Sequence, residues 1–276
     1  MAFFRHRCVG VLAIPVLGLI ILHAGCTERA ANTQITTVEK PATGALRLTP
    51  VGIDASEPDM AADDQGNIYV VFAEHVKGRT ADIKLLKLDI NGKTSGEAVQ
   101  VNSEPGAATV WAGDPPRIVV AGPNIYVSWT RKLKDVSHGG NDLVLSVSRD
   151  SGATFDPPVR VNDDVAPASH GMHSLAVAEN GDVVMLWLDE RSLVGRTAPA
   201  AAGHEMSEPN AEVFYAISRD DGKTFGTNTK IAGDVCPCCK TTLLAAKDRT
   251  IYAAWRHRVR RAPFEVLFHS LTVPDN

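Results

Sequence analysis

The sequence predicts an all-β protein with the architecture of a β-propeller. Segments rich in β-branched and aromatic residues recur at intervals of 57, 58 and 68 residues, beginning at Ile68, Ile125, Val183 and Ile251. Each follows a short apolar segment and a turn rich in Gly, Asn or Asp, and no helical periodicity separates the repeats. Short strands repeated about every 60 residues are typical of propeller blades.

Each repeat is expected to hold four strands, of which the recurring segment is the second. The first strands are Met60–Ala62, Ile118–Ala121, Leu175–Ala178 and Leu243–Ala246. The third are Ile83–Leu88, Leu143–Val147, Val213–Ile217 and Phe264–Phe268, and the fourth are Ala98–Val101, Pro158–Val161 and Thr229–Ile231. Since the last repeat lacks a fourth strand, we expect Ala45–Thr49 to supply it and close a four-bladed ring. The alternative is a truncated six-bladed propeller, which would leave exposed sheet edges.

Composition limits the class of protein. The 276 residues are 44% hydrophobic and 22% charged, with a net charge of −4, values that fit a folded globular chain. A nucleic-acid-binding protein normally carries a basic excess, so nucleic acid is not an expected partner. Five cysteines are too few for a disulfide scaffold of this length.

The N-terminal region has the features of an export signal. Two arginines precede an apolar run from Val9 to Leu22, and Ala24 and Gly25 follow it. The residues before Cys26 resemble a bacterial lipobox, with His23 where Leu is usual. We therefore expect a signal in residues 1–25, a lipidated Cys26, a tether over 26–44 and a propeller over 45–276. This predicts an exported, membrane-anchored lipoprotein of a bacterial cell envelope.

Two copies of one motif identify the type of propeller. The pattern S-x-D-x-G-x-T-F occurs in two repeats, each time between the expected third and fourth strands. Its residues are Ser148, Asp150, Gly152, Thr154 and Phe155 in one copy, and Ser218, Asp220, Gly222, Thr224 and Phe225 in the other. It matches the Asp-box, so residues 45–276 resemble the sialidase (neuraminidase) superfamily. Within the motif we expect structural roles, because Asp caps its own turn and Gly supplies a positive φ.

The resemblance implies that a ligand site lies on one face of the propeller. Sialidase chemistry needs an arginine cluster for a carboxylate, and Arg117, Arg191 and Arg256 are the candidates on the expected face. It also needs a Tyr nucleophile, yet the tyrosines fall in expected strands and none in a loop of that face. Catalytic residues therefore stay unassigned, and the arginines could equally be held by blade acids.

A cysteine cluster is the second candidate site. Cys236, Cys238 and Cys239 surround Pro237 in the loop leading into the last repeat. They could form a disulfide, bind copper or zinc together with His170 and His173 of the preceding repeat, or include a redox-active or reactive thiol. The Cys-Pro-Cys-Cys run resembles one in bacterial sialidase-like propellers, which implies a motif but no role.

Three functions stay open from the sequence. The first is a cell-envelope module that binds an anionic carbohydrate or an envelope protein. The second is an exo-sialidase or related glycosidase acting on terminal acidic sugars. The third is a copper- or zinc-binding propeller that uses the Cys-Pro-Cys-Cys loop.

Overall fold

A computed structural model describes residues 44–77, 80–111, 113–133, 140–196, 210–248, 250–257 and 265–272. The expected signal, Cys26 and most of the expected tether lie outside these residues. In the described part of the chain, no helix has the length and apolar character needed to cross a membrane.

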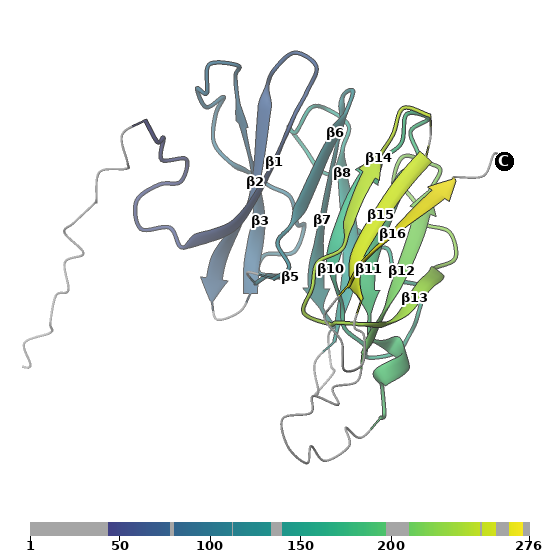
Figure 1. Ribbon diagram of the computed structural model, residues 1–276. Helices are drawn as coiled ribbons and strands as arrows, with labels where there is room; N and C mark the ends of the chain where they lie inside the picture. Colours follow the sequence, from purple (N-terminus) through teal and green to yellow (C-terminus); the bar gives the residue numbers. More distant parts are fainter. Residues whose placement is uncertain are drawn as a thin grey trace, which may run out of the picture. The chain divides into compact units, whose positions relative to one another are not determined.

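In the described residues, fifteen of the sixteen strands form four successive blades, and β5 links the first two (Figure 1). The first blade contains β1 (Ala55–Ala62), β2 (Ile68–Lys77), β3 (Thr80–Leu88) and β4 (Val99–Gln100). The second contains β6 (Arg117–Ala121), β7 (Asn124–Lys132), β8 (Asn141–Ser148) and β9 (Val159–Arg160). The third contains β10 (His170–Val177), β11 (Val183–Asp189), β12 (Ala211–Ser218) and β13 (Thr229–Val235), with the short 3₁₀ helix η1 (Arg191–Leu193) after β11. The fourth contains β14 (Thr242–Ala245), β15 (Thr250–His257) and β16 (Glu265–Thr272).

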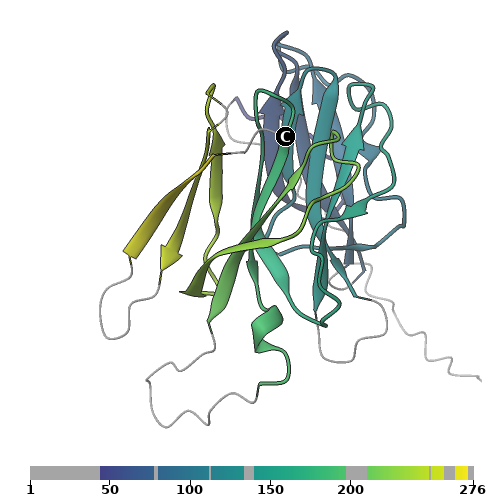
Figure 2. The same cartoon turned by 90° about the vertical axis from the view of Figure 1, so that its right-hand side faces the viewer.

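Within each blade, neighbouring strands pair in antiparallel fashion. Two small links join blades edge to edge. β5 (Ala108–Thr109) pairs with both β3 and β7, and Val235 of β13 pairs with His257 of β15. Figure 2 shows β14–β16 beside the sheet of β10–β13, as this second link requires.

The core lies between the blades. Alternating side chains of β2 and β3, such as Val71 and Ile83, pack with Val127 and Trp129 of the second blade. Equivalent clusters join the second blade to the third and the third to the fourth. The second strands β7 and β11 are buried at almost every position, because neighbouring blades cover both of their faces. Their sequences are therefore almost continuous apolar runs, which made them easy to predict.

The two Asp-box turns are closed by the same set of hydrogen bonds. Asp150 accepts bonds from the backbone N–H of Thr154 at 2.9 Å, from its hydroxyl at 2.6 Å and from the hydroxyl of Ser148 at 2.8 Å. Asp220 does the same with Thr224 and Ser218. Phe155 and Phe225 pack against the cores between blades. In these turns the aspartate fixes the backbone and the phenylalanine packs against the core.

The expected closing strand is not formed. Residues 45–49 have no regular secondary structure, and Leu46 is exposed. Within the described residues β16 therefore pairs only with β15, and the expected closure of the ring by this segment is wrong. A single short segment with no amphipathic partner offers little burial to offset the entropy of ordering it.

Two first strands begin earlier than predicted because they contain bulges. β1 and β10 shift register between Ser56 and Asp59 and between Gly171 and Ser174. At these bulges Glu57 and Met172 have φ values of 53° and 52°. A residue in this conformation interrupts the alternation of side chains, so the sequence pattern reveals only the regular half of each strand.

Candidate functional sites

The candidate residues gather at one end of the blades. Connections from second to third strands, and from a completed blade into the next first strand, meet at this end, which also carries η1 (the lower end in Figure 1). The Asp-box turns lie at the other end of their strands. We call the end that carries η1 the loop face.

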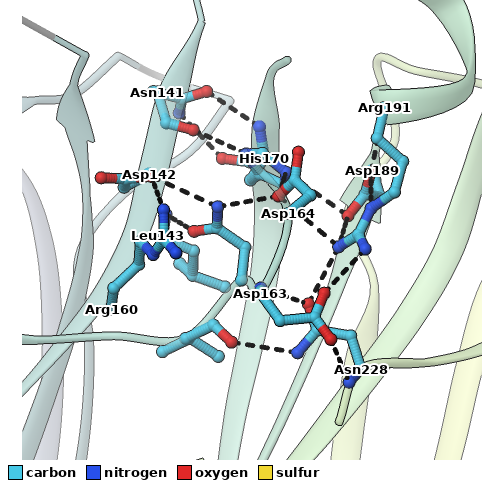
Figure 3. Close-up of polar contacts among 12 residues, drawn as sticks. Asn141, Asp142, Leu143, Arg160, Asp163, Asp164, His170, Asp189, Arg191 and Asn228 are labelled. Atoms are coloured by element: carbon cyan, nitrogen blue, oxygen red, sulfur yellow. Dashed lines mark hydrogen bonds and ion pairs between the residues drawn. The ribbon is translucent and has the colours of Figure 1, made fainter. Parts of the chain in front are cut away.

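Arg191 is the centre of a polar network on the loop face (Figure 3). Its guanidinium donates to both carboxylate oxygens of Asp189, at 2.9 and 2.8 Å, and to Asp163 at 2.8 Å. It also donates to Asn228 at 2.9 Å and lies 4.4 Å from the ring centroid of Phe214. Burial opposes its charge, but the bonds to Asp189 and Asp163 outweigh this and raise the pKa of Arg191. The guanidinium of Arg191 is therefore held by partners from its own blade and from the connection between the second and third blades.

His170 extends the network to the second blade. Its Nδ1 donates to the carbonyl of Asn141 at 2.6 Å, and the amide of Asn141 donates to the carbonyl of His170 at 2.8 Å. Its Nε2 lies 3.0 Å from Asp164 and 3.5 Å from Asp189. The imidazole is fully buried, so it acts here as a link between blades (Figure 3). Beside it, burial raises the pKa of the Glu190 carboxyl.

His173 and Arg117 lie in a second polar group at the start of β10 and β6. His173 is buried, with Nδ1 2.9 Å from Asp114 and Nε2 3.0 Å from the hydroxyl of Ser128. Arg117 donates to the carbonyl of His173 at 3.3 Å and lies 3.8 Å from Asp59. Both ring nitrogens of His173 are therefore engaged by the protein.

The three cysteines converge in a tight turn. The N–H of Cys239 donates to the carbonyl of Cys236 at 3.4 Å, and Pro237 occupies the second turn position, for which its fixed φ is suited. Thr241 anchors the turn to the third blade, because its N–H and hydroxyl both donate to the carbonyl of Met172, at 3.0 and 2.9 Å. The sulfur atoms lie within 4.8 Å of one another, and all three residues are free thiols.

The cluster is graded in exposure and acidity. Cys236 is buried, Cys239 intermediate and Cys238 exposed. Burial opposes ionisation of Cys236, but hydrogen bonds from Cys238, Cys239 and Arg256 lower its pKa, and Arg256 Nη2 lies 3.3 Å from its sulfur. Burial and the two neighbouring thiols raise the pKa of Cys239 to about 12. Cys236, with a guanidinium beside it, therefore ionises more readily than Cys239.

The structure separates several residues that the sequence analysis had combined. Arg117, Arg191 and Arg256 each contact a different group: Asp59, the Asp189 network and Cys236. His170 and His173 are not among the residues whose ligand atoms gather around the thiols. All four tyrosines lie in strands: Tyr69, Tyr126, Tyr215 and Tyr252.

Sequence reasoning missed two features of the loop face. Trp111 lies in the loop before β6 and is 54% exposed. The sequence around it contains no motif that would have marked it as a candidate. The cross-blade pairing of Val235 with His257, just before the cysteine turn, was not predicted either. The Cys-Pro-Cys-Cys spacing would have predicted the turn, but a cross-blade pairing has no local sequence signal.

Comparisons with known proteins show the fold and no more. No family model matches the chain, and no curated protein does. Among solved structures, the GH93 α-L-arabinofuranosidase of Fusarium graminearum in complex with arabinobiose is 10% identical over 82% of this chain, with a TM-score of 0.54. The chain spans 65% of that protein's length. An α-L-arabinofuranosidase from Lactobacillus brevis is 9% identical, covering 81% of this chain and 70% of its own, with a TM-score of 0.49.

The fold is that of a β-propeller. An endo-arabinase from Bacteroides thetaiotaomicron is also similar, at 13% identity over 78% of this chain and 75% of its own, with a TM-score of 0.45. At such identities the likeness concerns the arrangement of strands, and the activities belong to those proteins.

Proposed function

We propose that the loop face of this propeller binds one thiophilic metal ion, zinc or copper, through Cys236, Cys238 and Cys239. The observation that carries the proposal is the mutual approach of three free thiols within 4.8 Å. Thiolates select soft and borderline metals over calcium or magnesium.

The sulfur positions suit such an ion. With a metal–sulfur bond of about 2.3 Å, a tetrahedral site separates its sulfurs by about 3.8 Å. Cys239 Sγ lies 3.7 Å from the sulfurs of both Cys236 and Cys238. The Cys236–Cys238 separation is 2.9 Å, so one side-chain rotation has to open it. Arg256 supplies positive charge beside the thiolates, and the turn is already anchored through Thr241.

Metal analysis of the purified, reduced protein tests this proposal. We expect close to one zinc or copper per chain, lost in the double variant Cys238→Ser, Cys239→Ser. The matched control is Cys26→Ser, which removes a cysteine outside the cluster and should retain the metal. Equal metal content in the cluster variant and the control would refute the proposal.

Export of the chain and lipidation of Cys26 belong to the same proposal. Their support is the N-terminal sequence alone, with its apolar run followed by Ala24, Gly25 and Cys26. Mass spectrometry of the membrane fraction tests them: we expect a mature chain that begins at an acylated Cys26, and an unmodified N-terminus at Met1 would contradict it.

Carbohydrate binding is a second candidate, which one observation favours. Trp111 is the exposed member of the four tryptophans, the others being at most 6% exposed. Its ring lies over Gly113, where a Cβ atom would stand 2.1 Å from the ring, and Asp114 N–H donates to its carbonyl at 2.8 Å. Aromatic side chains are common in the lining of ligand sites.

A glycan array that includes acidic oligosaccharides tests the second candidate. We expect binding that Trp111→Ala abolishes and that Ile90→Ala retains, since Ile90 is 71% exposed in a hairpin turn and controls for removal of an exposed apolar side chain. Binding that survives Trp111→Ala would move the glycan site elsewhere.

A further inference from the structure

The third strand of each of the first three blades pairs with a fourth strand at its outer edge. Leu85 of β3 pairs with Val99, and Leu145 of β8 pairs with Val159. Within the described residues, β16 is the third strand of the fourth blade and pairs with β15 alone. Phe268 of β16 occupies the position of Leu85 and Leu145, since all three pair with the same position of a second strand. Those two leucines are at most 2% exposed, whereas Phe268 is 68% exposed.

The fourth strands bind this edge through a repeated set of hydrogen bonds. The N–H of Val101 donates to the carbonyl of Ile83 at 2.8 Å, and Asn102 Oδ1 accepts the N–H of Ile83 at 2.7 Å. The second blade repeats both bonds at Leu143, at 2.9 and 3.0 Å. Val266 of β16 is the equivalent of Ile83 and Leu143, so its N–H and carbonyl face the edge with which no described strand pairs.

The chain contains a segment that fits this edge and lies in no sheet. The two fourth strands read Val-Gln-Val-Asn over residues 99–102 and Val-Arg-Val-Asn over 159–162, and residues 46–49 read Leu-Arg-Leu-Thr. Each has branched apolar residues at alternate positions, followed by a side chain that can accept a hydrogen bond. Residues 45–49 have no regular secondary structure, and Leu46 is 61% exposed.

We propose that residues 45–49 of one copy of this chain add to the edge of β16 in a second copy, and that the second copy returns its own segment, forming a two-fold dimer. By the equivalence above, Leu46 pairs with Phe268 of the second copy. The N–H of Leu48 donates to the carbonyl of Val266, and the Thr49 hydroxyl accepts the N–H of Val266. Strand addition of this kind obtains its affinity from main-chain hydrogen bonds and its specificity from alternate side chains.

The surface beside the edge suits an apolar strand. Residues paired across neighbouring strands place their side chains on one face, so Leu46 would contact Phe268 directly. The ring of Phe268 stacks on Tyr252, with the centroids 5.3 Å apart and an angle of 22° between the planes. An incoming leucine therefore meets an apolar surface that the fourth blade has already formed.

A second copy is the occupant that the chain itself indicates. Its own segment does not pair with β16 in the structure, so one molecule presents both an open edge and a strand sequence that fits it. Exchange of one element between two copies satisfies both and leaves the remaining fold unchanged. The movement is confined to Pro50–Ile53, because the carbonyl of Asp54 already accepts the N–H of His75 at 2.8 Å.

Photocrosslinking of the purified full chain tests the inference. A benzophenone amino acid replaces Arg47, whose equivalents in β4 and β9 pair with the position of Leu267. We expect a covalent dimer on a denaturing gel, with the crosslink mapped by mass spectrometry to β16. Leu46→Asp combined with Leu48→Asp should lower its yield at least about tenfold, because two apolar side chains lose their burial. The matched control Ile90→Asp changes an exposed apolar residue of a hairpin turn and should leave the yield unchanged.

Each other outcome overturns the exchange. A crosslink from position 47 to β16 within one chain would mean that the segment closes its own blade. A dimer whose crosslinks lie outside β16, or whose yield survives the double variant, would place the contact elsewhere. A protein that sediments as a monomer at every concentration would have no such interface. Because residues 45–49 belong to no sheet of their own copy, the double variant should retain the urea midpoint of the wild type, which confirms that it is folded.

Discussion

Substitution of Gly152 by alanine tests how an Asp-box turn joins two blades. Gly152 has a φ of 91°, and a Cβ atom there would lie 2.8 Å from Leu85 Cδ2 of the first blade and 3.3 Å from Ile125 Cδ1. Both neighbours are fully or almost fully buried. The glycine therefore serves two purposes: it permits a left-handed backbone and it lets the turn press against the preceding blade.

The two costs can be separated with a second glycine. Gly92 has a φ of 78°, but nothing lies within 4 Å of a Cβ built on it. Alanine at a left-handed position costs about 1–2 kcal/mol, and overpacking a core adds about 1–3 kcal/mol. Gly92→Ala should show the first cost alone, whereas Gly152→Ala should lower the free energy of unfolding by about 2–5 kcal/mol.

Gly222, the equivalent residue of the third blade, should fall between them. Its Cβ would lie 2.9 Å from Leu145 and from Val147, and its φ is 81°. However, these two side chains also line a cavity of about 150 Å³ that Gly222 borders. Since they can shift into this space, the overlap at Gly222 is relieved more easily than the overlap at Gly152.

Urea unfolding, followed by the fluorescence of the buried Trp129 and Trp187, measures the three variants. We expect the order Gly152→Ala, Gly222→Ala, Gly92→Ala from most to least destabilised. The reasoning is refuted if Gly152→Ala and Gly92→Ala agree within about 0.5 kcal/mol, the size of an ordinary surface effect. That result would mean that the turn does not press on the first blade.

Three further predictions concern charge and activity. Arg191→Ala should destabilise the protein by about 3 kcal/mol, because it leaves the buried Asp189 without its partner. The control Arg149→Ala breaks an exposed pair with Asp156, and it should change stability by less than about 1 kcal/mol in the same urea assay. The pKa values of Asp150 and Asp220 are about 2: hydrogen bonds from Thr154 and Ser148 lower that of Asp150 from 3.8, and at Asp220 burial opposes ionisation but the bonds from Thr224 and Ser218 outweigh it. Their stabilisation is therefore present above about pH 4 and is lost as the pH falls toward 2, so the stability difference between wild type and Asp150→Asn should shrink over that window. A fluorogenic sialoside should not be hydrolysed, and turnover that Arg191→Ala abolishes would contradict this expectation.

The repeated strands were predictable and their departures from regularity were not. Second strands such as the one beginning near Ile125 are buried on both faces, so their nearly continuous apolar residues predict them. The bulges at Glu57 and Met172 depend on backbone strain that no apolar pattern reports. Ala45–Thr49 resembled the other fourth strands in sequence, but residues 45–49 find no sheet edge in the structure.

The candidate site shows the same limit. The meeting of Cys236, Cys238 and Cys239 follows from sequence spacing, because a turn around Pro237 brings its neighbours together. His170 and His173 come from a loop on the same face, yet a shared face does not fix where a side chain points. Both rings turn into the blades, where Asp164 and Asp114 bind them. Such pairings between distant repeats depend on tertiary packing.

The two ends of the blades use repetition differently, and this difference locates function. At the Asp-box end, two blades place the same residue types in the same hydrogen bonds, which is how a repeated structural need is met. On the loop face, the connections into successive first strands diverge: Asp114-Pro-Pro precedes β6, Ser169-His-Gly opens β10, and Cys236-Pro-Cys-Cys precedes β14. Equivalent positions in a repeat share their packing requirements, so residues that differ there are not explained by packing alone. Aspartate and histidine nevertheless bind each other inside the blades, whereas the three thiols contact one another and Arg256. Three thiols that contact one another suit a thiophilic ion, so among these connections the cysteine turn is the one on which the metal proposal rests.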